Sequence, residues 1–195
     1  VFELIFKDDK LPSNKALETF AKENNLLASW MYKWNNRLVI YTSSLKVESL
    51  QQTLKRLNAT GIKLYDNLFY DFNREKNCGD KPVDEWDNII LSANLVKNEK
   101  MQKEYLDYHK TQFEKWPEIS KGFCNAEFQR LAIFKKDRQL MLIISIPKGK
   151  KLDDLNPKTT LNNPKVDEWN AIMKKYQEGI EGTKPDEVWV FFKPI

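Results

Sequence analysis

The stretch "ASWMYKWNNRLVIY", residues 28–41, has the sequence pattern of a β-hairpin. The alternation in its first half predicts a strand that places Trp30, Tyr32 and Trp34 on one side of a sheet. Two asparagines then turn the chain, and "RLVIY" returns as the second strand. We interpret the three rings as a wall of the hydrophobic core, with direct contact to a ligand as the alternative.

The segments around this hairpin complete a unit with the order βαββαβ. We expect a strand at 1–7, a helix at 13–25 with Ser13 as its N-cap, a helix at 46–58 and a strand at 65–72. After a polar, turn-rich stretch, the same order returns as a strand at 86–96, a helix at 98–116, paired strands at 128–134 and 140–146, a helix at 165–177 and a strand at 186–192. The repeat rests on the order of the elements, because few residues are identical between the halves.

The order βαββαβ is that of the ferredoxin-like split motif, in which both helices cover one face of a four-stranded sheet. The other face is bare and needs a partner. We therefore predict an α+β fold in which tandem ferredoxin-like repeats form an intramolecular, pseudo-dimeric α/β barrel. The expected domains are an N-terminal repeat at 1–72, a linker at 73–85 and a C-terminal repeat at 86–195. Such a chain is a monomer that pairs with itself, and a further homodimer stays open.

Composition and charge exclude several kinds of partner. The formal net charge of +4 arises from 32 basic and 28 acidic residues spread along the chain, so we expect no nucleic acid partner. No stretch approaches the roughly 18 apolar residues that cross a bilayer, so we expect no membrane association. The compartment stays open, with the cytoplasm favoured, because the chain starts at Val1 rather than methionine and an export signal could have preceded it.

The two cysteines show no sign of a pair or of a metal site. Cys78 and Cys124 lie in polar surroundings, with neither a CxxC motif nor the Cys and His spacing of a zinc site. We expect no disulfide between them and no bound metal. Glycine-rich phosphate-binding motifs and the GxSxG motif are also missing from the sequence.

The expected helix at 98–116 contains His109, the only histidine of the chain. A helical period puts Tyr105, His109 and Gln112 on the inward face, with Tyr105 and His109 one turn apart. An inward histidine is in most proteins a ring that donates one hydrogen bond and fills space. Here the face carries several polar groups, whose burial is costly unless they line a cavity that holds water or a ligand.

Three motifs follow one another in the second half: "EYLDYHKTQFEKWPE" at 104–118, "PKVDEWNAIM" at 164–173 and "EVWVFFKPI" at 187–195, with a hairpin between the first two. This arrangement resembles the L-rhamnose mutarotase family over residues 86–195. The resemblance implies a ferredoxin-like α/β barrel that interconverts the anomers of a deoxyhexose without a cofactor. It also implies that His109 transfers the proton, that Tyr105 assists and that Trp169 lines the sugar pocket.

The sequence departs from the family at several positions. The connection from His109 to the Trp-Pro-Glu motif is longer than in the family. The family's strand tyrosine corresponds to Leu131 or Arg130, and its tryptophan pair corresponds to Glu168 and Trp169. Since residues 1–72 contain no histidine, we expect the N-terminal repeat to be a degenerate copy that serves as a built-in partner. The further candidates for sugar binding are Tyr108, Trp116, Glu127, Arg130 and Glu168.

These inferences predict an enzyme of the racemase and epimerase class, a mutarotase for L-rhamnose or another deoxyhexose. Anomer exchange requires a base for the anomeric hydroxyl and an acid for the ring oxygen, and an imidazole can serve as either near neutral pH. Tyr105, Glu127 or Glu168 could supply the second group. Two alternatives stay open, a non-catalytic module that binds a carbohydrate or another small ligand and a cofactor-free monooxygenase, because this barrel carries unrelated sites.

Overall fold

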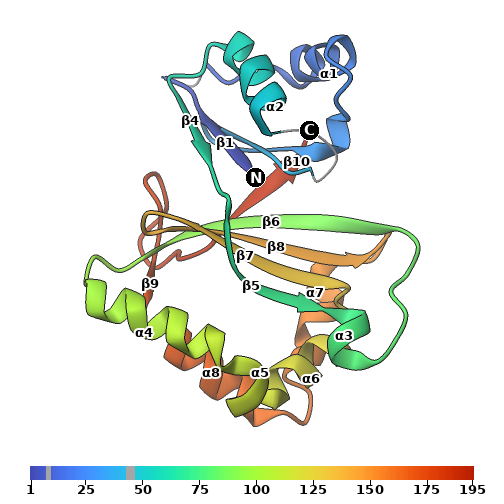
Figure 1. The fold of residues 1–195 in the computed structure, drawn as a ribbon, viewed down its shortest axis with the longest axis vertical. Coiled ribbons are helices and arrows are strands. Elements are labelled where there is room, and N and C mark those ends of the chain that lie inside the picture. Colours follow the sequence, from blue (N-terminus) through green and yellow to red (C-terminus); the bar gives the residue numbers. More distant parts are fainter. Residues whose placement is uncertain (8–9, 43–46) are drawn as a thin grey trace. The chain divides into compact units, whose positions relative to one another are not determined.

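The computed structural model describes residues 1–7, 10–42 and 47–195, in which the chain forms two compact units (Figure 1). Unit 1 comprises Val1–Asp66 and Phe191–Ile195, and unit 2 comprises Asn67–Val190. The chain combines helices with curved antiparallel strands, so the predicted α+β class is confirmed. The expected packing of two sheets into one barrel concerns the arrangement of the units and stays a prediction.

Unit 1 consists of helices packed on an antiparallel sheet. Its elements are β1 (Phe2–Ile5), α1 (Asn14–Glu23), β2 (Met31–Trp34), β3 (Arg37–Ile40), α2 (Val47–Leu54), β4 (Gly61–Leu64) and β10 (Val190–Pro194), with short 3-10 helices at Ala28–Trp30 and Lys55–Leu57. The strands lie in the order β4-β1-β3-β2-β10. Leu4, Leu38 and the helical residues Leu17 and Leu54 are fully buried in its core.

The predicted hairpin of unit 1 is confirmed. Strands β2 and β3 pair in the register Met31↔Ile40, and the turn between them contains Asn35 with a positive φ of 47°, which asparagine tolerates well. Trp30 differs from the prediction, because the chain forms a 3-10 helix at Ala28–Trp30 before the strand begins. Trp30 packs against the same core cluster as Met31, whereas Trp34 contacts the ring of Phe192 at 6.3 Å between centroids.

The helices of unit 1 agree with the sequence where the structure describes them. The Ser13 hydroxyl accepts a hydrogen bond from the backbone N–H of Ala16 at 3.3 Å, which is the expected N-cap of α1. The second helix is expected to begin at Lys46, which lies outside the described residues. The described helix α2 covers Val47–Leu54.

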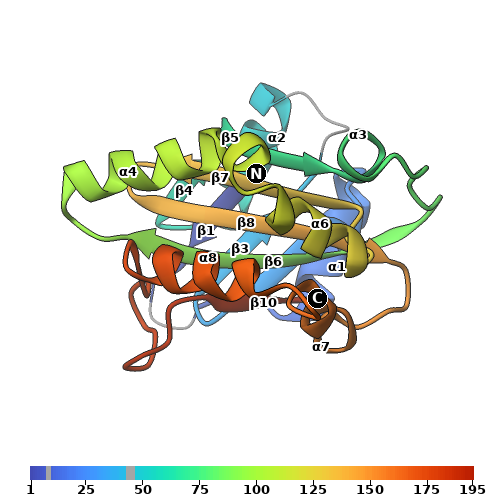
Figure 2. The same cartoon turned by 90° about the horizontal axis from the view of Figure 1, so that it is seen from below.

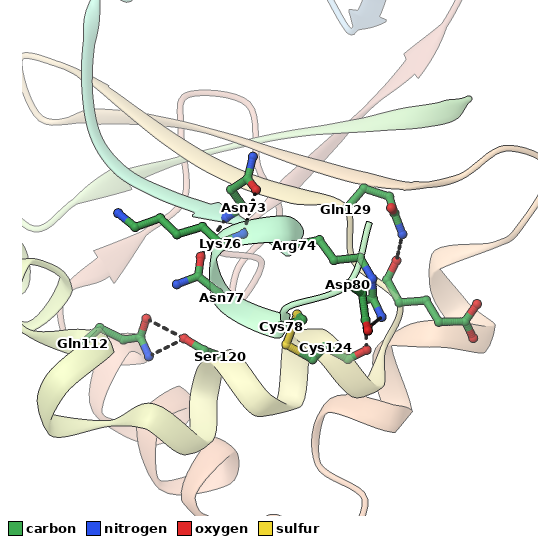
Figure 3. The surroundings of a disulfide bond; sticks show 11 residues. Asn73, Arg74, Lys76, Asn77, Cys78, Asp80, Gln112, Ser120, Cys124 and Gln129 are labelled. Carbon is green, nitrogen blue, oxygen red and sulfur yellow. Dashed lines mark hydrogen bonds and ion pairs between the residues drawn. A yellow bond between two sulfur atoms is a disulfide. The ribbon is translucent and has the colours of Figure 1, made fainter. Parts of the chain in front are cut away.

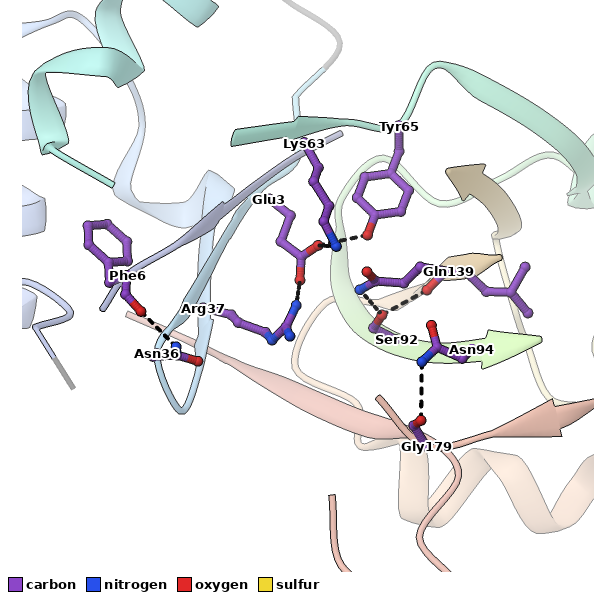
Figure 4. Close-up of polar contacts among 11 residues, drawn as sticks. Glu3, Phe6, Asn36, Arg37, Lys63, Tyr65, Ser92, Asn94, Gln139 and Gly179 are labelled. Atoms are coloured by element: carbon purple, nitrogen blue, oxygen red, sulfur yellow. Dashed lines mark hydrogen bonds and ion pairs between the residues drawn. The ribbon is translucent and has the colours of Figure 1, made fainter. Parts of the chain in front are cut away.

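A carboxylate on β1 connects parts of unit 1 that are distant in sequence. Glu3 accepts hydrogen bonds from Arg37 Nη1 at 2.8 Å and from the Tyr65 hydroxyl at 2.7 Å (Figure 4). Hydrogen bonds between charged partners are stronger than neutral ones. The two hydrogen bonds of Glu3 link β1 to β3 and to the segment that follows β4.

Unit 2 is a second antiparallel sheet with helices on one face. Its elements are β5 (Asn67–Asn73), α3 (Arg74–Cys78), β6 (Trp86–Leu95), α4 (Glu99–Lys110), α5 (Gln112–Lys115), α6 (Pro117–Asn125), β7 (Arg130–Lys136), β8 (Gln139–Pro147), α7 (Leu152–Leu155), a 3-10 helix at Asn156–Thr159, α8 (Pro164–Lys174) and β9 (Gln177–Glu178). The strands lie in the order β9-β6-β8-β7-β5. Helices α4, α6 and α8 lie on the same face of the sheet (Figures 1 and 2). In the part of the chain that the structure describes, none of the helices is long and apolar enough to cross a membrane.

The strand predicted at 65–72 differs from the structure. The chain forms β4 at Gly61–Leu64 and then a separate strand, β5, at Asn67–Asn73. Strand β5 pairs with β7 in the register Phe72↔Leu131, so it belongs to unit 2. The predicted boundary at residue 72 therefore falls inside unit 2, and the predicted linker begins with the helix α3.

The end of the chain also differs from the prediction. A strand is expected at 186–192, but Asp186 has a positive φ of 68° and the strand β10 begins only at Val190. Strand β10 pairs with β2 in the register Lys193↔Lys33. The short strand β9 pairs with β6 instead, in the register Leu95↔Gln177.

The prediction that the cysteines do not pair is wrong. Cys78 at the end of α3 and Cys124 in α6 form a disulfide with a Cα–Cα distance of 5.8 Å (Figure 3). Arg74 of α3 also donates to the carbonyl of Cys124 at 3.1 Å and pairs with Asp80 at 2.7 Å. The two cysteines are 46 residues apart, and only the docking of α3 beside α6 brings them together.

The disulfide is expected to stabilise unit 2 by closing a long loop in the unfolded chain. Replacing both cysteines (Cys78→Ser with Cys124→Ser) should lower the free energy of unfolding by about 3 kcal/mol. Urea unfolding of the native and doubly substituted chains measures this difference. An identical unfolding curve for the native chain with and without reductant would contradict the pairing.

Candidate active site

A cavity of about 470 Å³ lies between the helices and the sheet of unit 2. Its apolar walls come from β7 and β8 on one side and from α6 and α8 on the other. Its polar lining is Tyr70, Tyr105, His109, Asn156, Trp169, Asn170, Lys174, Gln177, Asp186 and Trp189. A mostly apolar pocket with a few convergent polar groups is the usual form of a small-molecule site.

Helix α4 contributes Tyr105 and His109 to the lining of this cavity. Asn98 caps its start by accepting from the Met101 N–H at 3.2 Å, and the helix ends at Lys110, earlier than the predicted 116. Tyr105 and His109 lie one turn apart on its buried face, with ring centroids 4.2 Å apart. The imidazole also contacts the rings of Tyr70 and Trp169, each at 5.2 Å. The predicted inward face of the helix is therefore confirmed.

The backbone determines the tautomer of His109. Its Nδ1 lies 2.9 Å from the carbonyl oxygen of Tyr105. A carbonyl oxygen only accepts hydrogen bonds, so Nδ1 carries the proton and Nε2 of the neutral ring carries a lone pair. Burial lowers the pKa of His109 to about 4, and the hydrogen bond to the Tyr105 carbonyl opposes this in part. At neutral pH the ring is an uncharged base.

Two tyrosines face the imidazole, and each has an amide partner. The Tyr70 hydroxyl donates to Gln112 Oε1 at 2.6 Å, and the Tyr105 hydroxyl accepts from Gln177 Nε2 at 3.3 Å. Gln177 Oε1 in turn accepts from Trp189 Nε1 at 3.2 Å. Burial raises the pKa of both tyrosines above the ordinary value, so both hydroxyls stay protonated at neutral pH.

Gln112 is held by several contacts of its own. It is fully buried, and its Nε2 donates to the Trp116 carbonyl at 2.7 Å and to the Ser120 hydroxyl at 3.2 Å (Figure 3). Gln112 therefore joins α5 to α6 and fixes the direction of the Tyr70 hydroxyl.

The other residues predicted for sugar binding do not all meet at this cavity. Trp169 lines the cavity, and its side chain is buried. Tyr108 and Trp116 lie behind Trp169, with ring centroids 6.0 and 5.6 Å from it, and line a separate surface hollow. The remaining three form ion pairs elsewhere: Glu127 with Lys158, Arg130 with Asp71, and Glu168 with Lys165.

The sequence analysis missed Tyr70, Gln177 and Trp189. Tyr70 lies on β5, which the sequence assigns to the other unit, and only the pairing of β5 with β7 brings it to the cavity. Gln177 lies on β9, after the end of α8, and Trp189 directly precedes β10. The expected helix at 165–177 and strand at 186–192 include these two residues, but neither pattern assigns them to the cavity. Their one sequence signal is the motif "EVWVFF", which contains Trp189.

These features define an α+β protein of ferredoxin-like strand order with a pocket for a small molecule in its second unit. Hydroxyl, amide, indole and imidazole groups line the pocket, and its ionic side chains, Lys174 and Asp186, are exposed to solvent. Within the described residues, no group of three or more His, Cys, Asp or Glu side chains is placed to hold a metal ion.

The comparison with known families agrees with this class. The L-rhamnose mutarotase family matches residues 89–195, more than half of the chain, and the chain belongs to this family. The chain is 23% identical over 116 residues to a UPF0734 protein of Dictyostelium discoideum, an alignment that covers 57% of this chain and 86% of that protein. It is 25% identical over 80 residues to an L-fucose mutarotase of Xanthomonas campestris pv. campestris, covering 39% of this chain and 60% of that enzyme.

The buried imidazole is expected to make stability depend on pH. In the unfolded chain His109 takes up a proton near its ordinary pKa of about 6.5, whereas the folded chain resists protonation down to about 4. The unfolded state therefore binds more protons between these values, and stability falls as the pH falls from 7 to 5, by about 2 kcal/mol. Urea unfolding at both pH values measures this loss.

The matched variant for this measurement is His109→Phe, which keeps a ring of similar size. Because His109 is the only histidine, the variant should lose most of the pH dependence between 7 and 5. An equal fall in both proteins would show that His109 is not the buried neutral base.

Proposed function

We propose that the protein interconverts the α and β anomers of a deoxyhexose, with L-rhamnose and L-fucose as the first candidates, by proton transfer through His109. The observation that carries the proposal is the bare Nε2 of a neutral, buried imidazole in the cavity. Family membership supports the reaction, and the names of the relatives supply the two candidate sugars.

The reaction needs one base and one acid. The base removes the proton of the anomeric hydroxyl as the bond from C1 to the ring oxygen breaks, and the acid protonates that oxygen, which gives the open-chain aldehyde. Rotation about the C1–C2 bond and closure by the reverse steps give the other anomer, so no net proton is consumed. His109 Nε2 serves as the base.

Tyr105 is the best-placed second group. Of the three candidates from the sequence, only Tyr105 lines the cavity, because Glu127 and Glu168 form ion pairs with lysines outside it. Its hydroxyl stays protonated near neutral pH. Trp169 supplies an apolar ring surface on which the C–H face of a sugar can stack.

In this proposal unit 1 has a structural role and contributes no catalytic residue. Its first four strands have the ferredoxin-like order β4-β1-β3-β2, and its sequence contains no histidine. We propose that it is a degenerate repeat that replaces the second subunit of a dimeric barrel, so that the chain acts as a monomer.

Removing the imidazole is expected to abolish the activity. Saturation-transfer NMR of L-rhamnose and L-fucose should show anomer exchange accelerated by the native chain and reduced about 100-fold or more by His109→Ala. Lys103→Ala, on the exposed face of the same helix, is the control and should keep the native rate. If no sugar exchanges faster with the native chain but sugar signals broaden on binding, the chain is a binding module instead.

The activity is expected to fall only at an unusually low pH for a histidine base. Because the base must be unprotonated, the rate constant for exchange should stay level from pH 8 to about 5 and fall as the pH approaches 4, the pKa of the buried ring. The spontaneous rate is measured at each pH and subtracted. A fall centred near 6.5, the ordinary value for histidine, would contradict a buried base.

A further inference from the structure

Gln177 and Trp189 form a chain of hydrogen bonds that ends on Tyr105. Trp189 Nε1 lies 3.2 Å from Gln177 Oε1, and Gln177 Nε2 lies 3.3 Å from the Tyr105 hydroxyl oxygen. An indole N–H can only donate, so the amide presents its oxygen to Trp189 and its NH₂ group to Tyr105. Trp189 therefore determines the orientation of the Gln177 amide.

The backbone of Gln177 is held by the sheet. Gln177 and Glu178 form β9, which pairs with β6 in the register Leu95↔Gln177. Two residues further on, the carbonyl of Gly179 accepts a hydrogen bond from Asn94 Nδ2 at 3.2 Å (Figure 4). The amide group thus extends from a fixed point at the edge of the cavity.

The direction of this hydrogen bond decides where the Tyr105 proton points. Because the Tyr105 oxygen accepts from Gln177, its own hydrogen is not used in that contact. No other acceptor for this hydrogen is found among the residues that the structure describes, and Tyr105 lines the cavity. The hydroxyl of Tyr70, by contrast, already donates to Gln112.

The two central groups of the cavity therefore have opposite roles. His109 gives its only N–H to the backbone and presents a lone pair, whereas Tyr105 receives a hydrogen bond from Gln177 and presents a hydrogen. A reaction that takes a proton from one sugar oxygen and gives one to another needs this combination.

We propose that Gln177 and Trp189 are positioning residues, which hold Tyr105 as the proton donor to the ring oxygen while His109 accepts the proton of the anomeric hydroxyl. This inference rests on the proposed mutarotase function. It adds two residues that act on the reaction by fixing the direction of the hydrogen bond between Gln177 and Tyr105. When the ring closes, the hydroxyl that was the ring oxygen returns its proton to Tyr105, and His109 returns its proton to the anomeric oxygen. The step therefore consumes no net proton.

The test is Gln177→Glu, which keeps the shape of the side chain but removes the N–H donor. A carboxylate can only accept, so Tyr105 should turn its hydrogen toward residue 177 and away from the sugar. At pH 7.5 we expect kcat to fall about 10-fold or more, with KM within about 2-fold of the native value.

Acidification distinguishes positioning from a structural role. A protonated carboxyl group has a C=O that accepts from Trp189 and an O–H that donates to Tyr105, which restores the native pattern. The ordinary pKa of a glutamic acid is about 4.3. We therefore expect kcat of Gln177→Glu, divided by that of the native chain at the same pH, to rise as the pH falls from 7.5 to 4. The same exchange at the exposed Gln51 of α2, Gln51→Glu, controls for the added charge and should behave as native.

Two further measurements keep the inference open to refutation. Trp189→Phe removes the orienting N–H without adding charge, and we expect a lower kcat with no rise on acidification. The ¹³Cζ signal of Tyr105 in ¹³C-tyrosine-labelled Gln177→Glu should shift between pH 4 and 7.5 as its hydrogen changes acceptor, and this readout needs no activity. A native kcat in both variants, or an unmoved signal, overturns the positioning role. If the native chain accelerates no sugar, the proposed function fails, and the NMR shift alone decides the direction of the hydrogen bond.

Discussion

The hydrogen bond from His109 Nδ1 to the Tyr105 carbonyl is the interaction on which the site depends. It spans one helical turn, so it exists only because α4 is regular through Lys110. It fixes the tautomer, so that Nε2 carries the lone pair of a ring that lines the cavity, while burial keeps the ring neutral. A histidine whose Nδ1 had no such partner could take either tautomer and would carry the lone pair on Nε2 for only part of the time.

The placement of Tyr105 and His109 on one buried face could be predicted from the sequence because both lie on one helix. The period of a helix places Tyr105 and His109 on one face whatever the rest of the chain does, and a single histidine leaves no choice of imidazole. The surrounding residues could not be found in this way. Tyr70 reaches the cavity only through the pairing of β5 with β7, and Gln177 only through that of β9 with β6. Neither pairing leaves a local period.

The disulfide and the boundary between the units were missed for the same reason. The turn-rich composition of the stretch after Asn73 predicts a linker, but this stretch contains the short helix α3. The disulfide between Cys78 and Cys124 connects α3 to α6. Helix α6 also contributes Phe123 to the cavity wall. The covalent link therefore fixes a wall of the site to the strand that carries Tyr70, a connection visible only in three dimensions.

The distribution of unpaired polar groups is a physical argument for a site rather than a core. A buried donor or acceptor without a partner costs about 1–3 kcal/mol, so a chain that uses these side chains only for packing should pair all of them. In the described residues around the imidazole, Tyr70, Gln112 and Gln177 each have partners, whereas His109 Nε2 and the Tyr105 hydrogen have none. The groups without a protein partner are thus one acceptor and one donor, on two residues whose ring centroids lie 4.2 Å apart and which line the same cavity. Because these groups line a cavity instead of a closed core, water or a ligand can supply the partners that the protein does not.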